Sequence, residues 1–200
     1  MAIDTRIRAH AGDEPTCSVT GPFSHHPGFF GRVEAEVLFR NLQADVCWQQ
    51  EWLTLYGRRL PVPRLLSWCG DHGVNYRYSG TDHPCEGWLP AVTALRRRLA
   101  EEAGFRSNLV LMNRYRDGRD HMGWHTDDER GLAGRIASVS LGAARRFLIR
   151  WPGEARARAI DLQPGALLIM DGRLRHALPR TRKPVGERIN LTFRWVDAGR

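Results

Sequence analysis

His125 and Asp127 stand two residues apart in the stretch GWHTDDE, residues 123–129, of a chain whose formal net charge is +8. An imidazole and a carboxylate at this spacing point to the same side of an extended backbone, so they can bind one cation together. A third candidate ligand, His176, follows a predicted turn at residues 171–172. The simpler alternative is that the acids form a solvated loop.

Two histidines and one carboxylate are the ligand set of non-haem iron(II) oxygenases, in which they occupy one face of the metal. Zinc is the alternative metal for the same residues, as in hydrolases. Arg188 and Arg194 favour iron, because they share one face of a predicted strand over 188–195 and can bind the carboxylates of a dicarboxylate co-substrate. His121 is separated from His125 and Asp127 by an even number of residues, so it is an alternative candidate for a metal ligand. We expect it to lie outside the metal site.

Two helices and a series of short strands are predicted around these residues. Apolar side chains recur at helical spacing over 29–42 and over 89–103, where Pro90 lies near the start and Gly104 follows the end. Beyond Gly104 the pattern changes to short apolar segments separated by turns, at 108–115, 136–141, 146–151, 158–162, 166–171 and 188–195. This order indicates an α+β fold whose second half is a β-sandwich or jelly roll.

The 30 basic residues are all arginines except Lys183, and several of them cluster over 58–64, 96–98 and 173–182. Clustered guanidinium groups favour a phosphate-rich partner such as nucleic acid, although a genomic bias toward arginine would give the same composition. No segment approaches the roughly 20 apolar residues of a membrane helix, which predicts no membrane contact. The four cysteines are widely spaced, so we expect reduced thiols in a monomeric, cytoplasmic protein.

Four segments taken together resemble the AlkB family of iron(II)- and 2-oxoglutarate-dependent dioxygenases, and most of all its duplex-DNA branch: NRYRDGRDHMGWHTDDE, RIASVSLG, RHALPRTRK and RINLTFR. The resemblance runs in order from Leu53 to Trp195. It implies a double-stranded β-helix (jelly-roll) core with N-terminal helices and a nucleotide-recognition lid over 53–90. We therefore expect a flexible tail over 1–22 and a single dioxygenase domain over 23–200.

The resemblance also implies roles at matching positions. It implies that Fe(II) and catalysis depend on His125, Asp127 and His176. It implies that 2-oxoglutarate is bound by a second set, namely Asn113, Tyr115, Arg188, Asn190 and Arg194. It implies that the alkylated base and its strand are bound by a third set, namely Leu55, Tyr56, Arg64, Tyr76, Tyr78 and Glu129. In that set Tyr78 stacks on a flipped base, Glu129 lies near its amino group, and Arg64 faces phosphate.

The activity implied is oxidative demethylation of bases such as 1-methyladenine and 3-methylcytosine in DNA, with O2 as the oxidant and formaldehyde, succinate and carbon dioxide as products. Two alternatives stay open. The chain can be an oxygenase of another substrate, such as RNA, a protein or a small molecule, or a nucleic-acid-binding module on an inactive jelly roll. The arginines and paired tyrosines of the lid favour a nucleic-acid substrate, and the intact ligand set favours activity.

The stretch LTLYGRRLPVPR, residues 53–64, contains a further candidate. Leu55, Tyr56 and Gly57 match the apolar hairpin finger that duplex-acting members of this family insert into the base stack. An apolar wedge there would fill the gap left by an extruded base while the two following arginines meet phosphates. The alternative is that Leu55 and Tyr56 are core residues of a short strand.

Overall fold

Strand β14 (Arg188–Arg194) is buried along its whole length and lies inside a six-stranded sheet. Its apolar side chains pack into a core cluster, and its polar side chains alternate with them on the opposite face. The computed structural model describes residues 21–78, 81–127, 132 and 134–197. The sheet order is β1-β12-β9-β14-β7-β4, in which the other strands are β1 (Phe23–His26), β12 (Leu167–Asp171), β9 (Arg135–Gly142), β7 (Leu109–Tyr115) and β4 (Leu65–Gly70).

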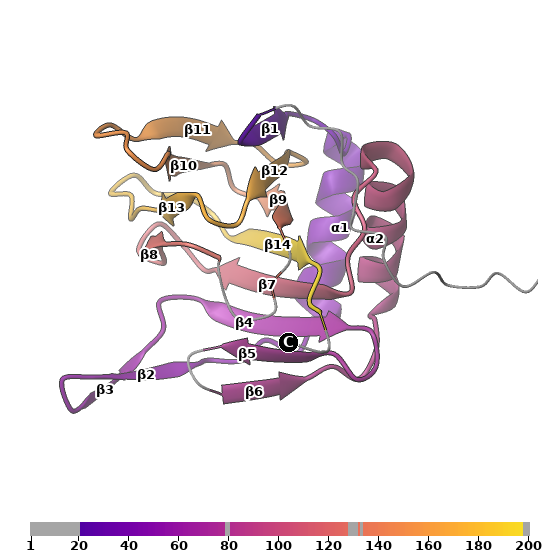
Figure 1. Ribbon diagram of the computed structural model, residues 1–200, viewed down its shortest axis with the longest axis horizontal. Helices are drawn as coiled ribbons and strands as arrows, with labels where there is room; N and C mark the ends of the chain where they lie inside the picture. Colours follow the sequence, from indigo (N-terminus) through magenta and orange to yellow (C-terminus); the bar gives the residue numbers. More distant parts are fainter. Residues whose placement is uncertain (1–20, 79–80, 128–131, 133, 198–200) are drawn as a thin grey trace, which may run out of the picture.

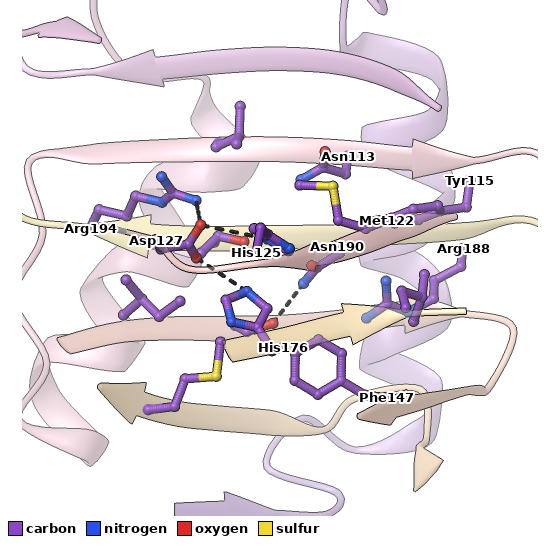
Figure 2. Close-up of a pocket in the computed structure, with 16 residues that line it drawn as sticks. Asn113, Tyr115, Met122, His125, Asp127, Phe147, His176, Arg188, Asn190 and Arg194 are labelled. Atoms are coloured by element: carbon purple, nitrogen blue, oxygen red, sulfur yellow. Dashed lines mark hydrogen bonds and ion pairs between the residues drawn. The ribbon is translucent and has the colours of Figure 1, made fainter. Parts of the chain in front are cut away.

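A second sheet of four strands lies across a cavity from the polar face of β14 (Figures 1 and 2). Its order is β11-β10-β13-β8, with β11 (Arg158–Leu162), β10 (Arg145–Arg150), β13 (Arg175–Leu178) and β8 (Met122–His125). All pairings in both sheets are antiparallel. Two facing antiparallel sheets around a shared interior form a jelly roll, so the predicted α+β fold with this core is confirmed.

Two helices, α1 (Arg32–Asp45) and α2 (Pro90–Ala103), cover one side of the six-stranded sheet (Figure 1). Leu42 of α1 and Leu99 of α2 are fully buried in the cluster that contains the apolar row of β14. The helices therefore cover the sheet face that points away from the cavity. The polar face of β14 is not covered by them and lines the cavity.

The helix ends follow local chemistry. Helix α2 starts with Pro90, which has no N–H, and a residue at this position needs none because its N–H would have no acceptor within the helix. The helix ends at Gly104, which has a left-handed φ of 62°. Helix α1 starts at Arg32 rather than near Phe29, because the backbone N–H of Phe30 donates to the carbonyl oxygen of Gly165 at 3.0 Å. A long-range hydrogen bond of this kind is not visible in the sequence pattern.

Two small hairpins lie outside the two sheets. Strands β2 (Trp52–Leu55) and β3 (Arg58–Pro61) form one, which extends away from the body of the protein (Figure 1). Tyr56 and Gly57 connect its strands with φ values of 49° and 72°. Two consecutive left-handed residues form the tight turn that joins twisted strands, and this conformation is uncommon for a tyrosine.

The second hairpin pairs β5 (Asn75–Tyr78) with β6 (Thr81–Pro84) and lies below β4 in Figure 1. The predicted lid, residues 53–90, thus contains both hairpins and strand β4. The predicted tail, residues 1–22, falls outside the described residues up to Thr20, and the domain boundaries stay predictions. Neither described helix has the length and apolar character needed to cross a membrane.

Candidate active site

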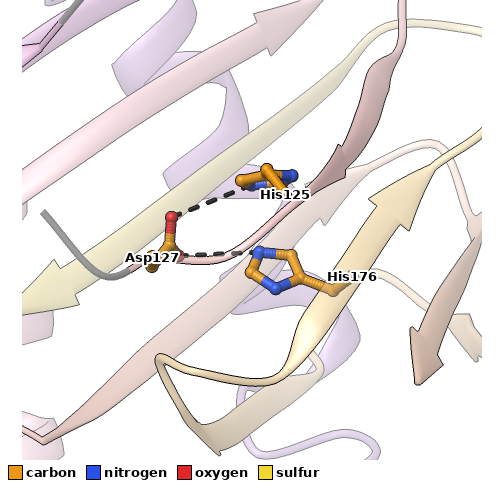
Figure 3. A group of neighbouring side chains, drawn as sticks. All are labelled: His125, Asp127 and His176. Carbon is orange, nitrogen blue, oxygen red and sulfur yellow. Dashed lines mark ion pairs between the residues drawn. The ribbon is translucent and has the colours of Figure 1, made fainter. Parts of the chain in front are cut away.

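The three predicted metal ligands meet at one point of the cavity (Figure 3). His125 ends β8, and His176 lies directly opposite it in β13. Asp127 follows two residues after His125, with its Oδ1 3.8 Å from His125 Nε2 and its Oδ2 3.6 Å from His176 Nε2. Their candidate ligand atoms all lie within 4.8 Å of one another, which is close enough to share one metal ion. These are the ligand types and open arrangement that iron(II) oxygenases use.

Backbone carbonyls orient both imidazole rings. Nδ1 of His125 lies 2.9 Å from the carbonyl oxygen of Gly123, and Nδ1 of His176 lies 2.8 Å from that of Leu174. A carbonyl only accepts, so each Nδ1 carries the proton and each Nε2 offers its lone pair to a metal. Burial lowers the pKa of His176 to about 4, which keeps this ring neutral and able to bind a metal at physiological pH.

Asp127 is buried and held as a carboxylate. Burial alone would raise its pKa, but the charge and hydrogen bond of Arg194, together with the nearby His176 and His125, outweigh that effect and keep the pKa below its ordinary value. Arg194 Nη2 lies 3.0 Å from Asp127 Oδ1. The backbone N–H of Asp127 donates to the carbonyl oxygen of Gly172, so both ends of the residue are fixed.

Gly172 passes so close to this ligand that a side chain does not fit. A Cβ at this position would clash with the backbone oxygen of Asp127. The predicted turn at residues 171–172 lies between β12 and β13. Through the hydrogen bond from the Asp127 N–H to the Gly172 carbonyl oxygen, this turn also supports the metal ligand Asp127.

The predicted co-substrate residues line the same cavity as the metal ligands (Figure 2). They come from β7 and β14, two neighbouring strands of the six-stranded sheet, where Asn190 lies opposite Asn113 and Arg188 lies opposite Tyr115. The alternation predicted for β7 and β14 thus places all five on one face: Asn113, Tyr115, Arg188, Asn190 and Arg194. Their contact with 2-oxoglutarate stays a prediction.

Arg188 is a buried cation that lines the cavity and has no ion pair with a carboxylate among the described residues. It is 1% exposed, its Nη2 donates to Ser140 Oγ at 2.9 Å, and its guanidinium carbon lies 5.4 Å from the centre of the Tyr115 ring. Among the described residues no carboxylate pairs with Arg188, and its Nε has no hydrogen-bond partner. Burial lowers its pKa to about 10. A small ligand with a carboxylate group would give the Arg188 guanidinium an ionic partner, and 2-oxoglutarate has two such groups.

Arg64 differs from the expectation. We expected it to face phosphate, but it is only 3% exposed and its Nε donates to Asn113 Oδ1 at 2.7 Å. The reason is that the chain turns inward after the hairpin to form β4, which pairs with β7 and brings Arg64 next to Asn113. Arg64 is therefore buried against Asn113, which lines the cavity, and does not lie on the outer face of the lid.

The predicted base-binding residues are only partly described. Tyr56 is fully exposed at the tip of the β2–β3 hairpin. Tyr76 and Tyr78 lie in β5, but their side chains, like that of Leu55 in β2, are outside what the structure describes. Glu129 lies outside the described residues altogether.

His121 lies outside the group of ligand atoms, as expected. Its Nδ1 lies 3.1 Å from the carbonyl oxygen of Arg119 and 3.1 Å from Arg180 Nε. Burial is the main cause that lowers its pKa. The competing assignment of His121 to the metal is therefore not supported.

Sequence reasoning missed two parts of the surroundings. Phe147 of β10 lines the cavity and packs on the ring of His176, with centroids 5.4 Å apart. A basic groove also lies outside the cavity, where β10 meets the segment after β13. It is lined by Arg145, Arg146, Arg180, Arg182 and Lys183, together with Asp161. The cluster of arginines near residue 180 was the visible signal, but its partners are distant in sequence.

Comparison with known proteins agrees with this geometry. A family model described as the 2OG-Fe(II) oxygenase superfamily matches residues 22–194. The protein named DNA oxidative demethylase ALKBH2 of Mus musculus is 38% identical over 188 residues, which cover 84% of this chain and 77% of that protein. The Homo sapiens protein of the same name is 37% identical, covering 84% and 70%.

A second group of relatives carries another name. The alpha-ketoglutarate-dependent dioxygenase alkB homolog 3 of Rattus norvegicus is 37% identical over 187 residues, which cover 86% of this chain and 63% of that protein. Among solved structures, that of OsALKBH1 has a TM-score of 0.59 at 20% identity and covers 88% of this chain and 99% of its own, which supports the fold. The chain is therefore a member of the 2OG-Fe(II) oxygenase superfamily and, within it, of the AlkB family, a dioxygenase that uses Fe(II) and 2-oxoglutarate.

Proposed function

We propose that this protein is an oxidative demethylase of N-alkylated bases in DNA, of the 1-methyladenine and 3-methylcytosine type. The observation that carries the proposal is a single cavity in which a His-Asp-His metal set lies together with a buried arginine that has no acidic partner among the described residues. O2 and 2-oxoglutarate are consumed, and formaldehyde, succinate and carbon dioxide are released. Relatives that are 37–38% identical carry names that describe this activity.

The protein's own residues bind and orient the reactants. Arg188 anchors the far carboxylate of 2-oxoglutarate, because it is the cavity's buried cation without an acidic partner among the described residues. Arg194, which is also predicted to contact the co-substrate, pairs with Asp127 and keeps that ligand charged. Iron held by the three ligands supplies the activation of dioxygen. Residues of both sheets line the cavity and surround the position of the reacting group.

The two facing asparagines meet the co-substrate differently. Nδ2 of Asn190 donates to Ser138 Oγ at 2.8 Å and to the Val139 carbonyl oxygen at 2.9 Å. Both of its N–H groups are thus engaged in the sheet, and only its carbonyl oxygen can face the cavity. Asn113 accepts a hydrogen bond from Arg64 and keeps its N–H groups for a ligand.

The β2–β3 hairpin is proposed as the wedge that enters duplex DNA. Tyr56 stands fully exposed at its tip, which excludes the alternative that this residue belongs to the core. Trp52 and Arg59 stack on the same hairpin, with the guanidinium carbon 5.1 Å from the ring centroid, and Arg58 is exposed beside them. An aromatic tip flanked by cations suits insertion between base pairs beside phosphates.

The basic groove is proposed as a second contact with the DNA backbone. Arg180, Arg182 and Lys183 are exposed there, and the one acid in its lining, Asp161, pairs with Arg146 at 3.2 Å. Excess positive charge on an exposed surface attracts phosphates at long range. A monomeric, cytoplasmic protein is part of the same proposal; Cys47, Cys69 and Cys85 are free thiols, as in a reducing compartment.

The test is repair of oligonucleotides that contain one methylated base, offered as single-stranded DNA, duplex DNA and RNA. We expect formaldehyde and restored base in equal amounts, only when Fe(II) and 2-oxoglutarate are both present. Turnover of 2-oxoglutarate with no repair of any oligonucleotide would instead indicate a protein or small-molecule substrate. Tight binding without any turnover would indicate an inactive binding module.

A further inference from the structure

Arg64 is buried although it directly follows an exposed hairpin. Its exposed fraction is 3%, whereas every residue of β3 is exposed. Its own backbone N–H donates to the Val62 carbonyl oxygen at 2.7 Å, and the neighbouring Pro63 carbonyl accepts from the His121 N–H at 3.1 Å. These bonds hold the chain where the buried Arg64 side chain contacts Asn113, which lines the cavity.

The contact between Arg64 and Asn113 determines which way the asparagine amide points. Arg64 Nε lies 2.7 Å from the terminal amide of Asn113. An arginine can only donate hydrogen bonds, so the amide must turn its carbonyl oxygen toward Arg64. Its NH2 group is then directed elsewhere, and Asn113 lines the cavity with the co-substrate residues. If Arg64 were replaced, the Asn113 amide would lose the donor that selects one of its two orientations.

Asn190 provides an internal comparison, because it lies directly opposite Asn113 in the sheet. Its NH2 group is taken up by two acceptors of β9, Ser138 Oγ and the Val139 carbonyl oxygen. Two neighbouring amides of the same cavity are therefore fixed in opposite senses, one as a donor and the other as an acceptor. Both orientations are set by hydrogen-bond partners within the protein, Arg64 for Asn113 and strand β9 for Asn190.

We propose that Arg64 is a positioning residue for the co-substrate, which fixes the Asn113 amide so that its N–H groups face an oxygen of 2-oxoglutarate. The inference rests on the proposed function, since it assigns a ligand to Asn113. An N–H donor stabilises a carboxylate or keto oxygen, whereas a flipped amide would place one oxygen against another. Arg64 thus acts on the co-substrate through Asn113.

The first experiment measures the affinity for 2-oxoglutarate calorimetrically, with Mn(II)-loaded protein and without nucleic acid. Arg64→Met removes the donor and keeps an apolar stem, and we expect the affinity to fall by about 3- to 10-fold. Arg64→Gln keeps a nitrogen at the same chain position as Nε, and we expect an affinity within about 2-fold of the wild type. The exposed Arg106 gives a matched control, Arg106→Met, with no change.

A second variant tests the amide orientation without removing the arginine. Asn113→Asp retains an oxygen for Arg64 and so preserves the buried contact, but it replaces the NH2 group with a second oxygen. We expect normal thermal unfolding and a loss of 2-oxoglutarate affinity of more than about 10-fold. In the Asn113→Ala background, Arg64→Met should have no further effect on that affinity.

Failure of the inference differs from failure of the proposed function. If wild-type protein did not bind 2-oxoglutarate at all, the proposed function would be wrong. If it bound but Arg64→Met and Arg64→Gln both matched the wild type, Arg64 would have no positioning role. Additive effects of Asn113→Ala and Arg64→Met on the 2-oxoglutarate affinity would also overturn the proposal, because they would show that Arg64 acts independently of Asn113.

Discussion

The cavity between the two sheets and the β2–β3 hairpin are built on opposite principles. In the cavity Arg188 is 1% exposed and each functional group has a fixed partner, such as Ser140 for Arg188 and Leu174 for His176. In the hairpin Tyr56 is wholly exposed, and Trp52 and all residues of β3 are exposed as well. An isolated two-stranded hairpin has little stability of its own.

This difference indicates a division of labour. Chemistry needs groups that are held in place before the reactants arrive, and the buried hydrogen bonds of the cavity provide that. Recognition of duplex DNA needs a protruding group that can enter the base stack, and burial would prevent it. Changes in the cavity should therefore impair turnover on every substrate, whereas changes in the hairpin should affect only some substrates.

The largest expected effect comes from the metal ligands. His125→Ala, Asp127→Ala or His176→Ala each removes one of the three protein ligands. We expect no detectable demethylation of single-stranded or duplex substrate, with circular dichroism like that of the wild type, because the three ligands are not part of the apolar core clusters. Near-normal turnover in any one variant would show that the replaced residue is not a ligand.

Arg188→Ala is expected to have the next largest effect. Loss of a buried cation that grips a carboxylate leaves that carboxylate unpaired, at a cost on the order of 2–5 kcal/mol. The 2-oxoglutarate concentration needed for half-maximal rate should rise accordingly, while the KM for DNA changes little. If both constants changed by the same factor, Arg188 would not be the co-substrate anchor.

Gly172→Ala should disturb the metal site without touching a ligand. A Cβ there clashes with the backbone of Asp127 and must displace it. Support around a metal ligand typically contributes about 10- to 100-fold to metal affinity, so Fe(II) binding should weaken by that order. Gly186→Ala is the matched control, because nothing lies near a Cβ at Gly186. Unchanged Fe(II) affinity in Gly172→Ala would mean that the turn does not position Asp127.

The smallest expected effects lie in the hairpin's charges. Arg58→Ala and Arg59→Ala should each reduce the slope of log K against log salt for duplex binding by about one unit, since each removes one phosphate contact. Turnover of saturating single-stranded substrate should stay the same. A slope that equals that of the wild type would place these arginines at the solvated surface, away from DNA.

The sequence predicted the cavity well because its residues follow local rules. The alternation along β7 and β14 places Asn113 and Arg188 on the same face, and the structure confirms that arrangement. Strands β8 and β13 were not predicted, because each has only four residues and little apolar pattern. Such strands exist here because they pair with neighbours that are distant in the sequence.

Arg64 and the basic groove were beyond sequence reasoning for the same physical reason. Next to a hairpin of exposed residues, Arg64 resembles another surface arginine, and only the pairing of β4 with β7 brings it to Asn113. The groove joins Arg145 and Arg146 to residues near Lys183. Its charge could be counted in the sequence, but its shape depends on the folded sheets.

The most direct test of this division of labour is the ratio of duplex to single-strand repair in Tyr56→Asn. Asparagine tolerates the left-handed turn and removes the ring, so thermal unfolding should not change. We expect duplex repair to fall by roughly 5- to 100-fold, from about 1–3 kcal/mol of lost stacking, with single-strand repair unchanged and with Tyr56→Phe close to the wild type. An equal loss on both substrates would contradict the account, because it would show that the exposed tip serves the cavity's chemistry and not the choice of substrate.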